Sequence, residues 1–245
     1  MAALTWDKSG ERYYETGVSK GVLYPLRGGR YGAGVPWNGL TAVNESSSGA
    51  EVTPGYADNT KYLNLMSAED FKATIEAYSY PDEFAQCDGS EKLAVGIMIG
   101  QQKRKPFGFC YRTEVGNDTE DMDAGYKIHL VFYCMAAPTD RSYATVNESP
   151  DAMTFSWELT TLPVEIDGCK PSATLVLDSR RFKKSAITNV LKHIEDILYG
   201  TQTTDPTFPK VSEILDVYDL EMYIRDSSND TILDSDGNMI QSRVF

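Results

Sequence analysis

Histidine and cysteine, the side chains that most often carry catalysis or bind metals, are scarce in this chain. It contains 2 histidines and 4 cysteines among 245 residues. The cysteines, at Cys87, Cys110, Cys134 and Cys169, are widely spaced and form no C-x-x-C motif, and they do not cluster with histidine at zinc spacing. In a reducing compartment we expect them to be reduced thiols of the core.

The common catalytic motifs are missing as well. No H-E-x-x-H, G-x-S-x-G or S-x-x-K occurs. His129 lies inside an apolar strand-like run and His193 beside the apolar stripe of a predicted helix, so both are interpreted as structural or surface residues. A Cys–His nucleophile pair stays open, because spatial neighbours need not be sequence neighbours. We expect no enzyme activity, and therefore no catalytic residue, cofactor or metal.

Long apolar runs and basic residues are also in short supply. The longest apolar run, 128–138, is too short to span a bilayer as a helix, and the amino end lacks the apolar segment of a signal peptide. The chain is expected to be made and to fold in a cytosol. With 36 acidic against 23 basic residues, its net charge is −13. Overall binding to a phosphate backbone is therefore not expected.

Most of the sequence predicts β-strands. Apolar and polar residues alternate, β-branched and aromatic residues are frequent, and Gly, Pro, Asn and Asp separate the runs, all of which favours strands. The predicted strands are Gly21–Leu26, Gly34–Val43, Asp70–Tyr80, Phe107–Val115, Tyr126–Met135, Arg141–Asn147, Met153–Ile166 and Ala173–Asp178. An Asp-Gly turn predicts a further hairpin over Ile232–Ile240.

One helix is predicted, over Lys184–Tyr199. Its apolar residues recur at helical spacing, Ser185 is placed to cap its start, and Gly200 is placed to cap its end. The expected fold class is all-β, sandwich-like or barrel-like, with one flanking α-helix. We expect a single domain over 1–245, with the acidic segment 201–245 either integral to it or appended.

Two features interrupt this pattern. Asn44–Thr60 has little periodicity and is interpreted as a long loop, a kind of segment that is usually functional or mobile. The tetrapeptide VNES at Val43–Ser46 recurs at Val146–Ser149. In both places a strand is expected to end just before it and an alternating strand to follow, which suggests a duplicated hairpin.

Three kinds of segment look like binding sites but favour plainer interpretations. Leu26–Gly34 lacks the Lys-Ser/Thr ending of a P-loop and precedes no helix, so a surface loop is expected. The acidic clusters at Asp118–Asp123 and Asp234–Asn238 do not match EF-hand spacing and are interpreted as solvated turns. Basic clusters at 103–105 and 180–184 are interpreted as exposed turns or as half of a charge contact between subunits.

Four segments carry a resemblance to a known family. They are VPWNGLTAVNESSSGAEVTPGYADNTKYLNLMSAEDFKATIEAYSYPDEFAQCDG, IGQQKRKPFGFCYRTEVGNDTE, YKIHLVFYCMAAP and SYATVNESPDAMTFSWELTTLPVEI. In these segments the chain resembles the major tail tube proteins of long-tailed, non-contractile bacteriophages and prophages of Gram-positive bacteria. The likeness runs from about 21 to about 179 and is weaker from about 200 on.

The resemblance implies a structural virion protein whose six-membered rings stack into the hollow tail tube through which DNA is delivered to the host. Each subunit would lend two long hairpins to a closed β-barrel around the channel. The implied partners are further copies of itself, a tape measure protein in the lumen, and tail terminator and distal tail proteins at the ends. Genome DNA would pass without sequence-specific binding, which suits an acidic chain. The implied location is the virion tail, assembled in the host cytoplasm.

The alternation of polar and apolar residues and the resemblance to tail tube proteins together assign two candidate surfaces. The strands Asp70–Tyr80 and Met153–Ile166 alternate most regularly, so their polar faces are expected to line the channel, with plain outer surface as the alternative. These lumen candidates are Lys72, Thr74, Glu76, Ser156, Glu158 and Thr160. The loop is expected to contact a neighbouring subunit or ring through Ser46, Ser47, Ser48, Gly49, Glu51, Pro54 and Tyr56.

Two other function classes stay open. A carbohydrate-binding or adhesin-like β-sandwich of a phage tail or cell surface would carry exposed aromatic residues in a groove, whereas Trp157 falls within an alternating strand and Trp37 at a strand start. A hydrolase would need paired acids held in a cleft. Only a tube subunit predicts long tubes of the purified protein under negative-stain microscopy.

Overall fold

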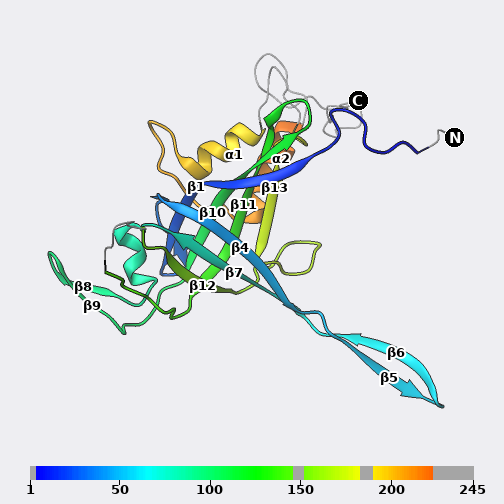
Figure 1. Cartoon of the computed structure of the whole chain (residues 1–245), viewed down its shortest axis with the longest axis horizontal. Coiled ribbons are helices and arrows are strands. Elements are labelled where there is room, and N and C mark those ends of the chain that lie inside the picture. Colours follow the sequence, from blue (N-terminus) through cyan, green and yellow to red (C-terminus); the bar gives the residue numbers. More distant parts are fainter. Residues whose placement is uncertain (1–3, 146–151, 183–189, 223–245) are drawn as a thin grey trace, which may run out of the picture.

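The computed structural model describes residues 4–145, 152–182 and 190–222 (Figure 1). This part of the chain is mainly strand with short helices at one side, which confirms the expected all-β class with a helical flank. The strands are β1 (Tyr14–Arg27), β2 (Arg30–Tyr31), β3 (Val35–Trp37), β4 (Leu40–Gly49), β5 (Val52–Ala57), β6 (Thr60–Met66), β7 (Glu69–Ala77), β8 (Glu91–Ala94), β9 (Ile97–Ile99), β10 (Phe107–Asn117), β11 (Asp121–Ala136), β12 (Phe155–Thr161) and β13 (Thr174–Asp178). The helices are the 3-10 helix η1 (Asp82–Gln86) and the α-helices α1 (Val190–Tyr199) and α2 (Val211–Met222).

One antiparallel sheet of 9 strands forms the body, in the order β2-β1-β10-β11-β12-β7-β4, with β3 also on β1 and β13 also on β11. The long strand β11 serves two partners: 127–131 pair with β13, and 134–136 pair with β12. Tyr133, between the two stretches, has a φ of 46°. A residue in this conformation interrupts a strand's regular course, so the sheet divides at this point.

The central strands bury both of their faces. On β1, Val22 and Tyr24 pack into one apolar cluster with the helices, while Leu23 between them packs into a second cluster. The second cluster joins β10 and β11 to β7 and β12, so the sheet must curl to enclose it. At its centre, Trp157 is fully buried, with its ring 5.5 Å from that of Trp37. Alternate side chains of one sheet thus supply two cores.

Helices α1 and α2 cover one face of the sheet, as expected for a flanking helix. Leu191, Ile194 and Leu198 are buried there, and the Tyr24 hydroxyl donates a hydrogen bond to the Leu198 carbonyl at 2.6 Å. Gly200, with a φ of 76°, ends the helix as expected. Helix α2 was not predicted, and a second helix therefore flanks the sheet. Its signal is an apolar residue at every third position in 211–217.

Several predicted boundaries differ from the structure. Residues 141–145 form no strand, so the described part of the prediction Arg141–Asn147 is wrong. The predicted strand Gly34–Val43 is two strands, β3 and β4, separated by a turn in which Gly39 has a φ of 80°. The β8–β9 hairpin was not predicted. The start of the predicted helix, with Ser185, and the predicted hairpin Ile232–Ile240 lie outside the described residues.

Candidate assembly surface

The predicted polar face exists as one continuous surface. Strands β7 and β12 are neighbours, and their register places Ser156 opposite Glu76, Glu158 opposite Thr74, and Thr160 opposite Lys72. All six side chains are exposed or half-buried. The intervening residues Ala73, Ile75, Ala77, Trp157 and Leu159 are all buried. The predicted division of these strands into a core face and a polar face is therefore correct.

Strand β4 widens this polar face on the other side of β7. Asn44 pairs with Thr74, and its amide Nδ2 donates a hydrogen bond to Oε1 of Glu76 at 3.4 Å. Glu76 and Glu158 are diagonal neighbours across β7 and β12, because Glu158 lies two positions beyond the residue opposite Glu76. The face therefore carries two nearby carboxylates on a background of hydroxyl and amide groups.

The segment interpreted as a long loop is instead a β-ribbon. Ser46 to Gly49 continue β4, which pairs with β7, and Pro54 and Tyr56 lie in β5, which pairs with β6. Asp58 and Asn59 close the ribbon with φ angles of 48° and 60°, the two left-handed residues of a tight hairpin turn. The first VNES copy lies within β4 rather than after a strand, and the second lies outside the described residues.

We call residues 50–67 the arm. Figure 1 shows the arm extending away from the sheet, with β5 and β6 beyond the end of the body. Every residue of β5 and β6 except Gly55 is exposed. Six of the exposed residues are large and hydrophobic: Val52, Tyr56, Tyr62, Leu63, Leu65 and Met66. An apolar surface of this kind in water is typical of a contact site.

A glycine joins the arm to the body. Gly49 has a φ of 88°, and a Cβ at this position would lie 2.2 Å from the carbonyl oxygen of Ala68, which lies between β6 and β7. Across the same junction, the Ala50 amide donates to the Ala68 carbonyl at 3.3 Å, and the Ser67 amide donates to the Glu51 carbonyl at 3.1 Å. The ribbon therefore changes course here without losing its pairing, at a position that only glycine can occupy without strain.

A buried histidine connects β4, the strand that leads into the arm, to the rest of the body. The ring of His129 stacks on Tyr111, with ring centroids 4.6 Å apart, and its Nδ1 lies 3.6 Å from Oε1 of Glu45 on β4. The Tyr111 hydroxyl donates to the same carboxylate. On its other side, Nε2 of His129 lies 3.0 Å from the Thr113 hydroxyl, which donates to Glu15 on β1. His129 is thus buried among contacts to β1, β4 and β10, which agrees with the first of its two interpretations, a structural or a surface residue.

This network perturbs the groups it contains. The contact with His129 lowers the pKa of Glu45 below its ordinary value, although partial burial acts in the opposite direction. Burial, reinforced by the hydrogen bond to Glu45, raises the pKa of Tyr111 well above the range of free tyrosine. Both pKa shifts favour the arrangement seen here, in which the Glu45 carboxylate accepts a hydrogen bond from the neutral Tyr111 hydroxyl. The network holds β4 against β10 and β11.

The other segments considered from the sequence have structural roles. Gly28 and Gly29, with φ angles of 58° and 80°, form a tight turn between β1 and β2 rather than an irregular loop. Asp118 accepts from the Gly10 amide at 2.9 Å and so fastens the amino-terminal segment to the β10–β11 turn. Of the four cysteines, Cys169 is exposed rather than in the core. Asp234–Asn238 lie outside the described residues, and among those described no cluster of potential ligands could hold a metal ion.

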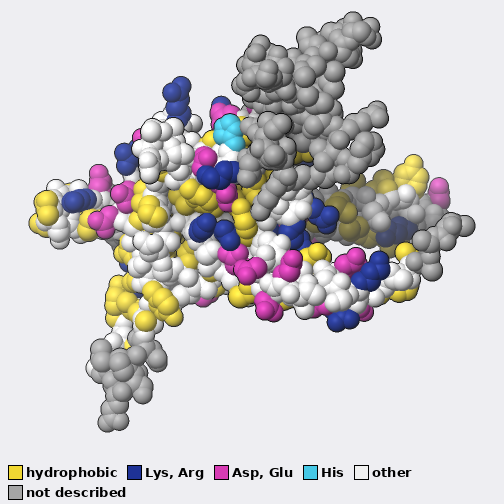
Figure 2. Space-filling view, turned by 90° about the horizontal axis from the view of Figure 1, so that it is seen from above, with side chains coloured by type: hydrophobic (Ala, Val, Ile, Leu, Met, Phe, Trp, Pro, Cys, Tyr) yellow, Lys and Arg dark blue, Asp and Glu magenta, His cyan; other side chains and the backbone are white. Residues whose placement is uncertain are grey.

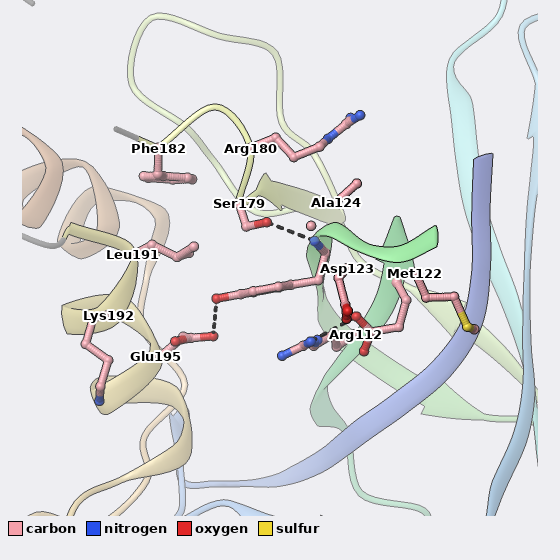
Figure 3. Close-up of a pocket in the computed structure, with 13 residues that line it drawn as sticks. Arg112, Met122, Asp123, Ala124, Ser179, Arg180, Phe182, Leu191, Lys192 and Glu195 are labelled. Atoms are coloured by element: carbon pink, nitrogen blue, oxygen red, sulfur yellow. Dashed lines mark hydrogen bonds and ion pairs between the residues drawn. The ribbon is translucent and has the colours of Figure 1, made fainter. Parts of the chain in front are cut away.

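One pocket, of about 520 Å³, lies between the sheet and α1 (Figure 3). Several of its polar groups contact one another. The Tyr126 hydroxyl donates to Glu195 at 2.8 Å, and the guanidinium of Arg112 lies 3.8 Å from the centre of the Tyr126 ring. Burial and the Glu195 contact raise the pKa of Tyr126 to about 12. These contacts attach the helix to the sheet, and sequence reasoning had not brought these residues together.

Comparison with known proteins gives little further guidance. No family model and no curated protein match the chain. Among solved structures it is similar to a chain of an anti-feeding prophage baseplate, at 8% identity and a TM-score of 0.35, over 71% of this chain and 97% of that one. It is also similar to a chain of the sheath–tube complex of an extracellular contractile injection system, at 14% identity and a TM-score of 0.29, over 65% and 88%. Scores this low carry no argument about function.

The described helices include none that is both long and apolar enough to cross a membrane.

Proposed function

We propose that this chain is a structural subunit of a phage tail, and that it assembles into six-membered rings which stack as the hollow tail tube. The observation that carries the proposal is that one ribbon has two distinct surfaces, a polar face on the sheet and an exposed apolar arm. Strands β4 and β7 carry a polar face over a buried core, and the same ribbon continues as an exposed arm. The sequence resemblance to non-contractile tail tube proteins supports the same role.

In this proposal the polar face of β4, β7 and β12 lines the channel. Copies side by side in a ring would continue the sheet around the lumen. Glu76 and Glu158 would then form rings of negative charge, which repel a phosphate backbone and let DNA slide past. A tape measure protein would fill the lumen before ejection, and terminator and distal tail proteins would cover the tube ends.

The arm is proposed to join neighbouring subunits or rings. Its strands have no core of their own, and a two-stranded ribbon by itself is marginally stable in water. Covering Tyr62 (75% exposed) and Leu65 (63% exposed) in a neighbour would remove apolar surface from water and hold the ribbon in place. Deleting the arm should therefore affect assembly and leave the subunit fold intact.

This is tested by replacing residues 50–68, the arm and Ala68, with an Asn-Gly turn that joins Gly49 on β4 directly to its register partner Glu69 on β7. The expected product is a folded monomer, by circular dichroism and sedimentation, that forms no tubes under negative-stain microscopy. The matched control carries Asp58→Asn and Asn59→Gly, which keep the arm and favour the same type of turn. Normal tubes from the shortened chain would contradict the proposed role of the arm.

The adhesin alternative receives less support. Trp37 and Trp157, the two tryptophans considered from the sequence, are 3% and 0% exposed and are therefore not available to a sugar. The tube proposal also assigns the chain a structural role rather than a catalytic one. An assay for binding to host-cell polysaccharide, run on the armless monomer, separates the two functions, because an adhesin would retain binding without its arm.

A further inference from the structure

A second projecting element, unrelated to the arm in sequence, lies at the opposite end of the molecule. We call Glu91–Ile99, the hairpin formed by β8 and β9, the tip hairpin. In Figure 1 the tip hairpin and the arm point away from the body at opposite ends of its longest axis, and Figure 2 shows hydrophobic side chains at both ends. Within one copy, therefore, the two elements do not meet.

The tip hairpin is as poorly covered as the arm. Val95 is 91% exposed, Leu93 62% and Ile97 55%. Its strands pair only with each other in the described part of the chain. Its base, by contrast, is fixed to the body: Arg104 forms an ion pair with Asp88 at 3.3 Å and donates to the Ala136 carbonyl at 3.0 Å. An apolar element held rigidly outside the body indicates a contact site rather than a flexible connector.

The two elements carry opposite charge. Residues 91–105, the tip hairpin and its basic flank, contain four basic residues and one acidic residue. Residues 50–70, the arm and its junction with β7, contain four acidic residues and one basic residue. Lys92 and Lys103 are exposed on the first segment, and Glu51 and Glu69 are exposed on the second. Both segments are thus apolar elements bordered by charge, and the two charges are complementary.

We propose that the tip hairpin of one copy of this chain docks against the arm of the next copy. Such a head-to-tail contact uses different surfaces on its two sides, and repeating it generates a ring or an open filament rather than a closed dimer. Apolar contact supplies the attraction, and the opposite charges fix which element meets which. The inference rests on the proposed self-assembly and names the receiving surface for the arm.

Exchanging the charges of the tip hairpin and the arm tests whether these two elements contact each other. Lys92→Glu with Lys103→Glu, or Glu51→Lys with Glu69→Lys, should each raise the protein concentration needed for assembly about tenfold. The four changes together should restore assembly to nearly the wild-type concentration, because the charges are again opposite. A combined variant that assembles worse than either pair overturns the contact.

Cross-linking tests the geometry without changing charge. In a Cys169→Ser background, which removes the exposed native thiol, one batch carries Val95→Cys and another Tyr62→Cys. Mild oxidation should give disulfide dimers in the mixture and about tenfold fewer in either batch alone. Equal dimer yields in all three samples overturn a head-to-tail contact.

The wild-type chain, observed under the same conditions, separates this inference from the proposed function. If the wild-type chain forms tubes but the combined charge variant does not regain assembly, only the hairpin–arm contact is overturned. If the two cysteine variants give the mixed cross-link but the wild-type chain forms no tubes, the contact is supported and the tube is contradicted.

Discussion

The body of the sheet and the arm are both built from antiparallel strands, yet they differ in what holds them. In the body, β7 lies between two partner strands and places Ala73, Ile75 and Ala77 in a closed aromatic core. In the arm, β5 and β6 pair only with each other and expose almost every residue. The same backbone pattern thus produces a self-sufficient element in one place and a dependent element in the other.

Hydrogen-bonded pairing alone does not decide whether a ribbon is stable in one copy or needs a partner. Backbone hydrogen bonds contribute little net free energy, since they replace bonds to water. Burial of side chains supplies most of the stability of a sheet. A ribbon that keeps its pairing but exposes Tyr62 and Leu65 is therefore shaped for burial in another molecule.

The largest expected contrast is between one aromatic residue of the body and one of the arm. Trp157→Ala should lower the free energy of unfolding by about 3–5 kcal/mol, because Trp157 is fully buried against Trp37 and Phe84. At this chain length, that corresponds to a fall in Tm of roughly 6–20 °C. Tyr62→Ala should change the free energy by no more than about 0.5 kcal/mol, yet reduce tube formation. Equal thermal destabilisation of the two variants would show that Tyr62 supports the fold of the subunit as Trp157 does.

The helix side of the body offers the next effect. Leu191→Ala on α1 should cost about 2–5 kcal/mol in urea unfolding, because Leu191 is buried against the outer face of the sheet. Leu215→Ala on α2 is the matched control, since Leu215 is 47% exposed, and it should cost less than about 1 kcal/mol. If both variants unfold alike, the helices are peripheral and the body depends on the aromatic core alone.

The same difference in burial explains which elements the sequence predicts. Alternation was readable in β7 and β12 because Ile75 and Trp157 lie in the core while Glu76 and Glu158 do not. The arm has no buried face, so nothing imposes a period on it, and it was interpreted as a loop. Its Asp58-Asn59 turn is the local signal that favoured a hairpin.

Contacts between distant segments were beyond sequence reasoning. The polar candidates were assigned correctly to one face of each strand, but that β7 and β12 pair directly depends on strand order, which alternation does not encode. The same holds for the group of Glu45, Tyr111 and His129, which three strands bring together. The apolar run around His129 allowed either a structural or a surface residue, and the structure shows it buried.

A smaller effect is expected at Glu45 on β4, the strand that leads into the arm. Glu45 has a lowered pKa in the folded protein, so its ionised form stabilises the fold above the ordinary pKa of 4.5, and this contribution declines below 4.5 as the pH falls through the lowered pKa of the folded state. Glu45→Gln should therefore cost about 1 kcal/mol at pH 7 and less than that near pH 3. Urea unfolding at the two pH values measures this, with Glu51→Gln as an exposed control. A cost that does not depend on pH would show that the carboxylate charge plays no part in the junction.

The smallest effect on stability, and the sharpest on function, is expected on the polar face. Glu76→Lys with Glu158→Lys should leave the free energy of unfolding within about 1 kcal/mol of wild type, because charges on a solvated sheet surface contribute little. In the proposed tube, however, the same changes convert a wall that repels DNA into one that binds it. Phage carrying them should build tails and eject DNA slowly, with the delay shrinking as salt is raised, since cation–phosphate attraction is salt-dependent.

Asp205→Lys with Asp216→Lys, on the helix-covered side, changes the net charge equally and should leave ejection unaltered. Normal ejection by the Glu76/Glu158 variant, or an equal delay in the control, would assign the polar face to the outside of the assembly and leave the arm as the only functional surface of this ribbon.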